Sequence, residues 1–153
     1  MPQNKLEYAI LIHYSEIALK KNNRPFFERK FIENITKHIK NLSYYKVRKI
    51  SSRIFIEGVN PSDWKLFNER MKNVMGLKNA TLMIKSDNTI QNMKKSIDVL
   101  INDCNYKTFR ISTKRHFKGF EKTSQELNME LGEYVLKKNN KAVSLDFPDL
   151  NII

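Results

Sequence analysis

Short apolar runs and amphipathic stretches alternate along the first half of the chain. Residues 7–14 (EYAILIHY) are a run of strand formers and predict a short β-strand. A helix follows from about Pro25, because apolar residues recur there every three or four positions. Its predicted apolar face consists of Phe27, Phe31, Ile35, Ile39 and Leu42.

Four further elements complete this half. The pattern predicts two strands, a helix and a last strand at Tyr44–Ile50, Arg53–Glu57, Pro61–Met75 and Ala80–Lys85. The order strand, helix, strand, strand, helix, strand is that of a ferredoxin-like split βαβ unit. We therefore expect residues 1–85 to form one such domain, with a sheet that buries one face under two helices.

The polar stretch Ser86–Thr89 predicts a link to a second domain at residues 86–153. Apolar residues between Ile90 and Cys104 predict a third helix, with Cys104 on its buried stripe. Lys107–Lys114 reads as a strand with alternating apolar residues. Thr123-Ser124-Gln125-Glu126 is a capping box that opens a fourth helix. Short strands are expected at Ala142–Leu145 and from Leu150 onward, so the predicted fold class is α+β throughout.

The charge balance indicates a polyanionic partner. The formal net charge is +12, from 28 Lys and Arg against 16 Asp and Glu. Most of this excess lies in residues 1–85, and the Lys and Arg residues of the second half cluster between Asn105 and Lys122. Basic side chains that neutralise phosphates release counterions, which favours nucleic acid as the partner.

No pattern in the chain indicates a catalytic centre. There is no Gly-rich phosphate loop, and the three histidines lack the spacing of a metal site. The single cysteine, Cys104, excludes an intrachain disulfide and is expected to be a buried structural thiol. Glu16 follows a strand and is expected to form an ion pair or fix a loop. No signal peptide or membrane span is visible, which predicts a cytoplasmic location.

Two basic loops are candidate RNA contacts. The loop Lys20–Arg24 (KKNNR) and the loop Lys114–Lys122 (KRHFKGFEK) each lead into the start of a helix, where free N–H groups and the dipole favour phosphate. We expect the two loops to form one RNA-facing surface. Phe117 or Phe120 could also stack on a base, although Phe120 is better explained as a core anchor of its loop.

At these loops the sequence resembles the tRNA 4-thiouridine synthetase family, whose members are also called thiamine-biosynthesis sulfurtransferases. The stretch Leu11–Arg24 is similar to that family's opening strand, its Arg-Tyr-Gly-Glu-Ile-like turn and its Leu-Lys-Gly-x-Asn-Arg-like loop. Phe109–Gly132 resembles its THUMP core, and Val143–Leu150 matches the run that follows. Shorter similarities lie at Ser52–Glu57 and Val74–Leu77.

The sequence departs from this family pattern at a few positions. His13 and Ser15 replace the usual Arg and Gly, and His116-Phe117 stand where a small residue and Asp are common. These departures concern individual RNA contacts rather than the fold.

The resemblance implies an N-terminal ferredoxin-like domain followed by a THUMP domain, which together hold tRNA near its acceptor end. It also implies a separate catalytic region that uses ATP and a persulfide sulfur supplied by a desulfurase, and a possible homodimer of the full-length protein. That region and the last THUMP strands are expected after Ile153, so we expect the chain to be a fragment or an incomplete gene product. The expected RNA-binding residues are Lys20, Lys21, Arg24, Arg53, Lys114, Arg115, Lys118 and Lys122.

Two other interpretations remain open from the sequence. The chain could be a THUMP module of another tRNA-modifying enzyme, such as a methyltransferase or deaminase. Alternatively, it could be a basic ferredoxin-like domain that binds protein or a small ligand. The Lys20–Arg24 loop and the N-terminal unit favour the sulfurtransferase. Under the leading hypothesis this chain positions tRNA and has no catalytic residue of its own.

Overall fold

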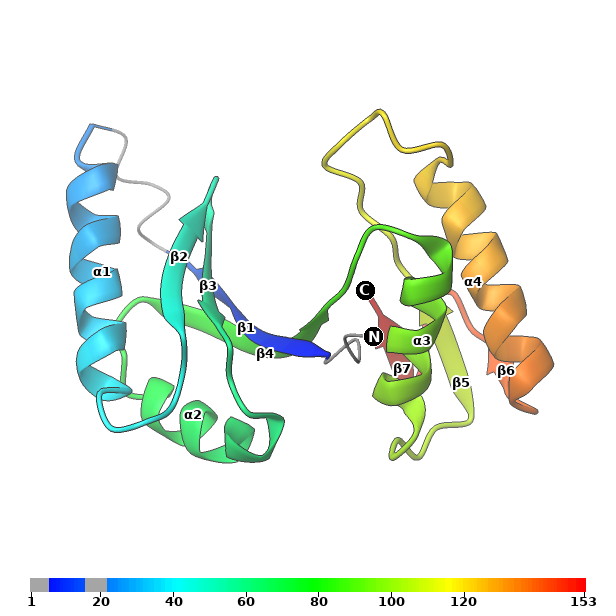
Figure 1. Ribbon diagram of the computed structural model, residues 1–153, viewed down its shortest axis with the longest axis horizontal. Coiled ribbons are helices and arrows are strands. Elements are labelled where there is room, and N and C mark those ends of the chain that lie inside the picture. The colour runs from blue at the N-terminus through cyan, green and yellow to red at the C-terminus, as the bar shows by residue number, and fades with distance from the viewer. Residues whose placement is uncertain (1–5, 16–21) are drawn as a thin grey trace, which may run out of the picture. The chain divides into compact units, whose positions relative to one another are not determined.

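The chain divides into two compact units. The computed structural model describes residues 6–15 and 22–153 (Figure 1). Unit 1 spans Met1–Ser86 and unit 2 spans Asp87–Ile153. Each unit has its own cluster of buried apolar side chains.

Unit 1 has the split βαβ order that the sequence predicts. Its elements are β1 (Glu7–Tyr14), α1 (Arg24–His38), β2 (Lys46–Ile50), β3 (Arg53–Glu57), the 3-10 turn η2 (Pro61–Asp63), α2 (Trp64–Met71) and β4 (Leu77–Lys85). The strands form one sheet in the order β2-β3-β1-β4, and all neighbours are antiparallel. The two-residue turn between β2 and β3 places Ser51 at a φ of 55°.

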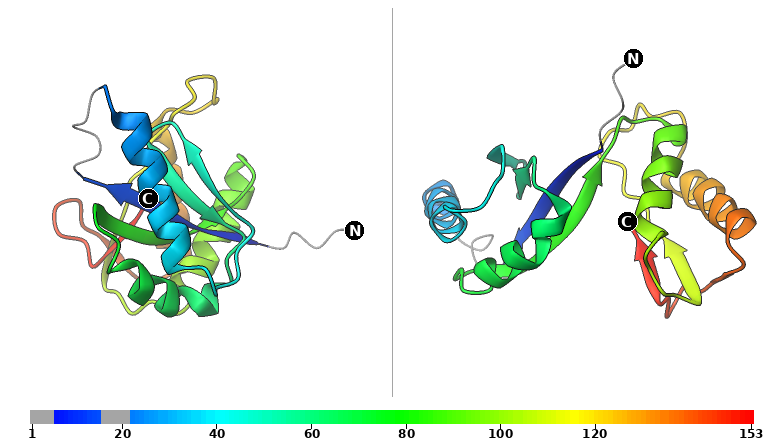
Figure 2. Two further views of the ribbon diagram at one scale, coloured as in Figure 1. Left: turned by 90° about the vertical axis from the view of Figure 1, so that its left-hand side faces the viewer. Right: turned by 60° about the horizontal axis from the view of Figure 1, so that its bottom comes forward.

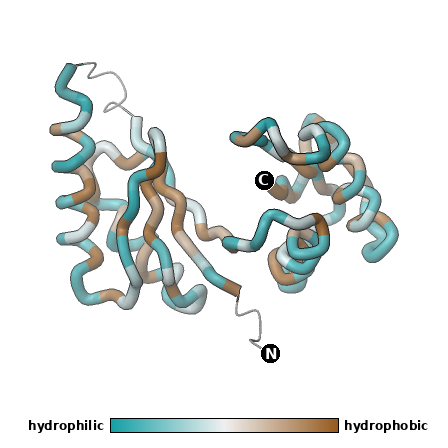
Figure 3. Tube along the Cα trace, turned by 45° about the horizontal axis from the view of Figure 1, so that its top comes forward, coloured by the Kyte–Doolittle hydropathy of each residue, from teal (hydrophilic) through white to brown (hydrophobic). Residues whose placement is uncertain are grey.

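Helices α1 and α2 cover one face of this sheet, as two views show (Figures 1 and 2). Alternate strand residues point into the core, because successive side chains of a strand face opposite ways. Ile10 and Ile12 of β1 and Ile54 and Ile56 of β3 are fully buried. The hydrophobic stretches of these strands are visible in Figure 3. The helices contribute Phe31, Ile35, Phe67 and Met71.

Unit 2 combines a small parallel sheet with two helices. Its elements are α3 (Ile90–Ile101), β5 (Thr108–Ile111), α4 (Ser124–Lys138), β6 (Ala142–Val143) and β7 (Leu150–Ile152). The strand order is β6-β5-β7, and β5 is parallel to both of its neighbours. The predicted alternation of β5 is confirmed, since Phe109 and Ile111 are buried.

The core of unit 2 lies where α3 and α4 pack on β5 and β7. Besides the two buried side chains of β5, it contains Ile97 and Ile101 from α3, Leu131 and Val135 from α4, and Ile152 from β7. Contacts between the helices reinforce this packing. Tyr134 of α4 donates a hydrogen bond to Asp98 of α3 over 2.7 Å, and Lys138 pairs with the same carboxylate.

Four local predictions are wrong. The strand predicted at Lys107–Lys114 spans only Thr108–Ile111. The second helix is shorter than Pro61–Met75, because it begins as a 3-10 turn and ends at Met71. The strand predicted at Ala142–Leu145 ends at Val143. Cys104 is exposed rather than buried, because α3 ends at Ile101 and a turn carries the thiol out of the helical stripe. There its Sγ donates to the carbonyl of Leu100.

Candidate nucleic-acid interface

The loop between β5 and α4 is fixed at both ends. At its far end Thr123 caps α4: the Glu126 amide donates to Thr123 Oγ1 over 3.2 Å, and the Thr123 amide donates to Glu126 Oε2 over 2.7 Å. This is the predicted capping box. The hydrogen bonds from Thr123 lower the pKa of the Glu126 carboxyl. At the near end the Thr113 amide donates to Asn128 Oδ1 of α4 over 2.7 Å.

Arg115 braces the middle of the same loop. Its Nη1 donates to the carbonyl oxygens of Phe120 and Lys122, at 3.4 and 3.0 Å. The side chain is partly buried, and within the described part of the chain its buried Nε has no hydrogen-bond partner. Arg115 therefore shapes the loop from within, and its predicted contact with RNA stays a prediction.

Lys122 is also engaged inside unit 2. Its ammonium group pairs with Glu130 of α4, which raises the pKa of Lys122. Glu130 also accepts from Lys94 of α3 over 3.2 Å. Lys122 therefore belongs to a charge network that joins the loop to both helices.

Lys114 and Lys118 are the loop cations that face solvent. Both residues are exposed. Among the interactions of the described residues, no hydrogen bond or ion pair involves either side chain. They stand on a loop braced by Arg115, so their charges are available to a phosphate-bearing partner at a defined place. The loop's two aromatics differ, since Phe120 is partly buried while Phe117 is 70% exposed.

The second predicted loop is described only in part. Lys20, Lys21 and Glu16 lie outside the described residues, so the expectation of one surface formed by both loops stays a prediction. Arg24 is the first residue of α1, and its Nε donates to Glu28 Oε1 over 2.9 Å. Arg53 starts β3, is partly buried and lies opposite Ile50 of β2.

Glu28 gathers three donors at the start of α1. The carboxylate is only 2% exposed and accepts from Arg24, from the Tyr14 hydroxyl over 2.5 Å, and from Lys49 of β2. Burial raises its pKa, but the hydrogen bonds from Lys49, Tyr14 and Arg24 outweigh that effect and the net shift is downward. Burial and the bond to Glu28 raise the pKa of Tyr14. The cluster holds the Arg24 side chain against α1. The Glu28 carboxylate therefore balances part of the charge of Arg24.

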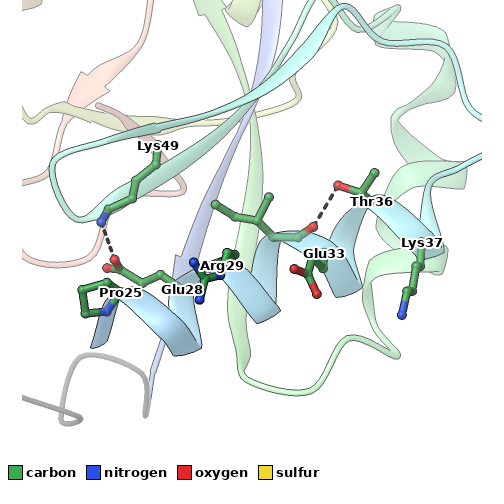
Figure 4. A pocket seen from close by; sticks show the side chains of 8 residues that line it. Pro25, Glu28, Arg29, Glu33, Thr36, Lys37 and Lys49 are labelled. Atoms are coloured by element: carbon green, nitrogen blue, oxygen red, sulfur yellow. Dashed lines mark hydrogen bonds and ion pairs between the residues drawn. The ribbon is translucent and has the colours of Figure 1, made fainter. Parts of the chain in front are cut away.

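A groove of about 510 Å³ runs along α1 beside this cluster (Figure 4). Figure 4 shows Lys49 reaching from β2 to Glu28, while Arg29 and Lys37 project from the helix. Sequence reasoning did not find this site, because Lys49 joins it only through packing of the β2–β3 hairpin against α1. The lining residues are Pro25, Glu28, Arg29, Ile32, Glu33, Thr36, Lys37 and Lys49.

The described residues lack the features of two other kinds of site. Within residues 6–15 and 22–153, no group of three or more His, Cys, Asp or Glu side chains is arranged to hold a metal ion. No helix in that part of the chain is long and apolar enough to cross a membrane.

Two family models match the chain and together cover most of it. Residues 9–81 match the ThiI ferredoxin-like domain, and residues 77–153 match the THUMP domain. These matches confirm the predicted domain order, in which a ferredoxin-like domain is followed by a THUMP domain.

Curated relatives from several bacteria carry one description. A protein of Thermoanaerobacter sp. (strain X514), called a probable tRNA sulfurtransferase, is 36% identical over 146 residues, which are 95% of this chain and 38% of the relative. A probable tRNA sulfurtransferase of Oceanobacillus iheyensis is 34% identical over 94% of this chain and 36% of its own length. The chain thus spans well under half the length of the curated relatives it matches.

Two solved structures share the architecture. A 4-thiouridine synthetase, crystallised as an RNA complex with bound ATP, matches with a TM-score of 0.76 and 28% identity over 96% of this chain and 37% of that protein. A protein of Pyrococcus horikoshii Ot3 matches with a TM-score of 0.80 over 95% of this chain and 51% of its own chain. At 18% identity, the second likeness concerns the fold alone.

Proposed function

Because the chain belongs to the THUMP-domain family and carries a ThiI ferredoxin-like domain ahead of its THUMP domain, we propose that it is the tRNA-binding part of a tRNA sulfurtransferase. In this proposal the parent protein makes 4-thiouridine in tRNA, and the chain positions the RNA near its acceptor end. The similarity to a 4-thiouridine synthetase that was crystallised with RNA and ATP supports it. A tRNA-modifying role would place the protein in the cytoplasm.

The chemistry of the parent protein belongs to the same proposal. An ATP-using region would activate the uridine, a persulfide would deliver sulfur, and a desulfurase would supply that sulfur. A homodimer and a role in thiamine biosynthesis are further expectations for the full-length protein. Residues 1–153 would hold tRNA without carrying out any of these steps. Incubation of the isolated chain with ATP, a sulfur donor and tRNA should therefore yield no thiouridine, and detectable product would contradict this division of labour.

The observation that carries the RNA-binding proposal is the braced basic loop of unit 2. RNA helices are recognised largely through their shape and phosphates, so a few fixed cations are sufficient for contact. Lys114 and Lys118 meet this need because they are exposed and Arg115 holds their loop in place. Arg115 supports binding chiefly through the loop's conformation.

The test reverses these two charges. In Lys114→Glu/Lys118→Glu, like-charge repulsion should weaken tRNA binding by at least tenfold near physiological salt while the fold stays intact. The control is Lys95→Glu/Lys137→Glu, which changes the net charge equally at exposed residues of α3 and of the opposite end of α4, where Lys137 makes only a surface ion pair with Glu133. Equal loss in both double variants would indicate a nonspecific effect of net charge, and no loss in the first would place the RNA surface elsewhere.

A further inference from the structure

Four phenylalanine and tyrosine side chains of the described residues are exposed, and their surroundings differ. They are Phe26, Tyr45, Phe117 and Phe147. The ring of Phe26 lies beneath the Arg29 guanidinium at 5.8 Å, and that of Tyr45 lies beneath Lys46 Nζ at 5.1 Å. Phe117 and Phe147 carry no cation of this kind in the described part of the chain. These two rings are 70% and 89% exposed; Tyr45 is 76% exposed, but Lys46 already lies over one of its faces.

Phe117 and Phe147 differ in the charge of the residues around them. Phe117 precedes Lys118 and follows Lys114 and Arg115, and residues 112–120 contain no carboxylate. Phe147 instead lies in a turn between Asp146 and Asp149, both exposed. A partner that carries phosphates is attracted to the first ring and repelled from the second. The two residues therefore form a natural pair for comparison.

The loop also restricts where the Phe117 ring can lie. A Cβ atom added to Gly119 would lie 2.4 Å from Phe117 Cζ and 2.6 Å from Cε1. The ring tip therefore lies directly against the backbone of Gly119. The same loop is braced by Arg115 through the carbonyls of Phe120 and Lys122. The brace fixes the backbone that carries the ring, so less of the loop has to be ordered when a partner stacks on it.

We propose that Phe117 stacks on an unpaired RNA base while Lys114 and Lys118 bind the phosphates beside that base. This inference rests on the proposed RNA-binding function and adds a contact that distinguishes unpaired from paired RNA. Bases within a duplex are already stacked on both faces, so only an unpaired base can offer its face to a side chain. Stacking of this kind tolerates any base, because each has a π face.

The experiment compares two RNA probes on the same variants. One is a single-stranded 12-nucleotide RNA that contains one 2-aminopurine, and the other is a blunt RNA duplex of 12 base pairs. Phe117→Ala should weaken binding of the single strand by roughly 5- to 150-fold and leave the duplex nearly unaffected. Phe117→Trp should restore single-strand binding and quench the 2-aminopurine. Phe147→Ala is the matched control and should change neither affinity.

Gly119→Ala gives an independent check, because the added methyl group displaces the ring without removing it. This variant should reproduce part of the single-strand defect with an unchanged melting temperature. Loss of affinity for both probes in Phe117→Ala, or for neither, overturns the stacking proposal. If Lys114→Glu/Lys118→Glu still weakens the binding of both probes in that case, the proposed RNA-binding function is kept and only the stacking contact is rejected. A wild-type chain that binds neither the probes nor tRNA at low salt contradicts the proposed function itself.

Discussion

Replacing Glu28 with Gln should destabilise unit 1 more than any other single charge-neutralising change in α1. Glu28 is almost fully buried and accepts hydrogen bonds from Tyr14, Arg24 and Lys49. The amide removes the charge that two cations need, and it places an N–H₂ group where only acceptors fit. Breaking a buried ion pair by removing one partner costs about 3–5 kcal/mol. Because Arg24 and Lys49 are 34% and 40% exposed and can regain water, we expect a smaller loss of about 2–3 kcal/mol.

The assay is urea unfolding followed by the fluorescence of Trp64. This is the only tryptophan of the chain, and it packs against the core of unit 1, so it reports on that unit. A loss of 2–3 kcal/mol should lower the urea midpoint by about 1–2 M for a domain of this size. Glu33→Gln is the matched control on the same helix. Glu33 pairs with Lys30 at the surface, so its replacement should leave the midpoint almost unchanged.

The pH dependence follows from the lowered pKa of Glu28. A carboxyl whose pKa is lower in the folded state stabilises the fold above its unfolded pKa, near 4.5, and loses that contribution as pH falls through the folded pKa. The difference between wild type and Glu28→Gln should therefore be full at pH 7 and shrink below about pH 4.5. Equal midpoints for Glu28→Gln and Glu33→Gln at pH 7 would refute the reasoning.

Three further predictions concern unit 2. Thr123→Ala removes the capping box of α4 and should destabilise unit 2 by about 1 kcal/mol, measured by hydrogen exchange of the α4 amides. Asp149 accepts from the Thr108 and Lys107 amides, both at 3.0 Å, which lowers its pKa. Asp149→Asn should therefore lower the melting temperature at pH 7, and the difference should fade as pH falls below about 3.8. The exposed Cys104 should react with a thiol reagent at the rate of a native surface thiol, without denaturant; protection until unfolding would contradict its position.

Local patterns predicted the elements of the fold well where a single face is buried. The four-residue spacing of Phe31, Ile35 and the capping residue Ile39 identified the buried face of α1. The alternation of Phe109 and Ile111 identified the buried face of β5. In both elements one periodic row of apolar residues packs against a single core. The residues close by in sequence therefore determine which face is buried. The Thr123–Glu126 capping box is similarly local.

Predictions failed or were incomplete where residues far apart in the sequence meet, or where the outcome depends on how the local backbone turns. Lys49 and Glu28 are joined only after the β2–β3 hairpin packs beside α1. The use of Arg115 as a brace depends on where the loop carbonyls of Phe120 and Lys122 turn. Cys104 continues the apolar spacing of α3, but the helix has ended three residues earlier. Periodicity alone does not locate such ends, because the competing turn depends on backbone hydrogen bonds.

The salt dependence of tRNA binding tests the central claim most directly. The logarithm of the wild-type association constant should fall linearly with the logarithm of salt concentration, because bound phosphates release counterions. In Lys114→Ala/Lys118→Ala the slope should be smaller in magnitude by about 1.5, since each lost phosphate contact removes roughly 0.7–0.9. Lys95→Ala/Lys137→Ala should keep the wild-type slope. A wild-type affinity that does not change with salt, or a slope that the Lys114 and Lys118 substitutions leave unaltered, would contradict an RNA-binding surface on this loop.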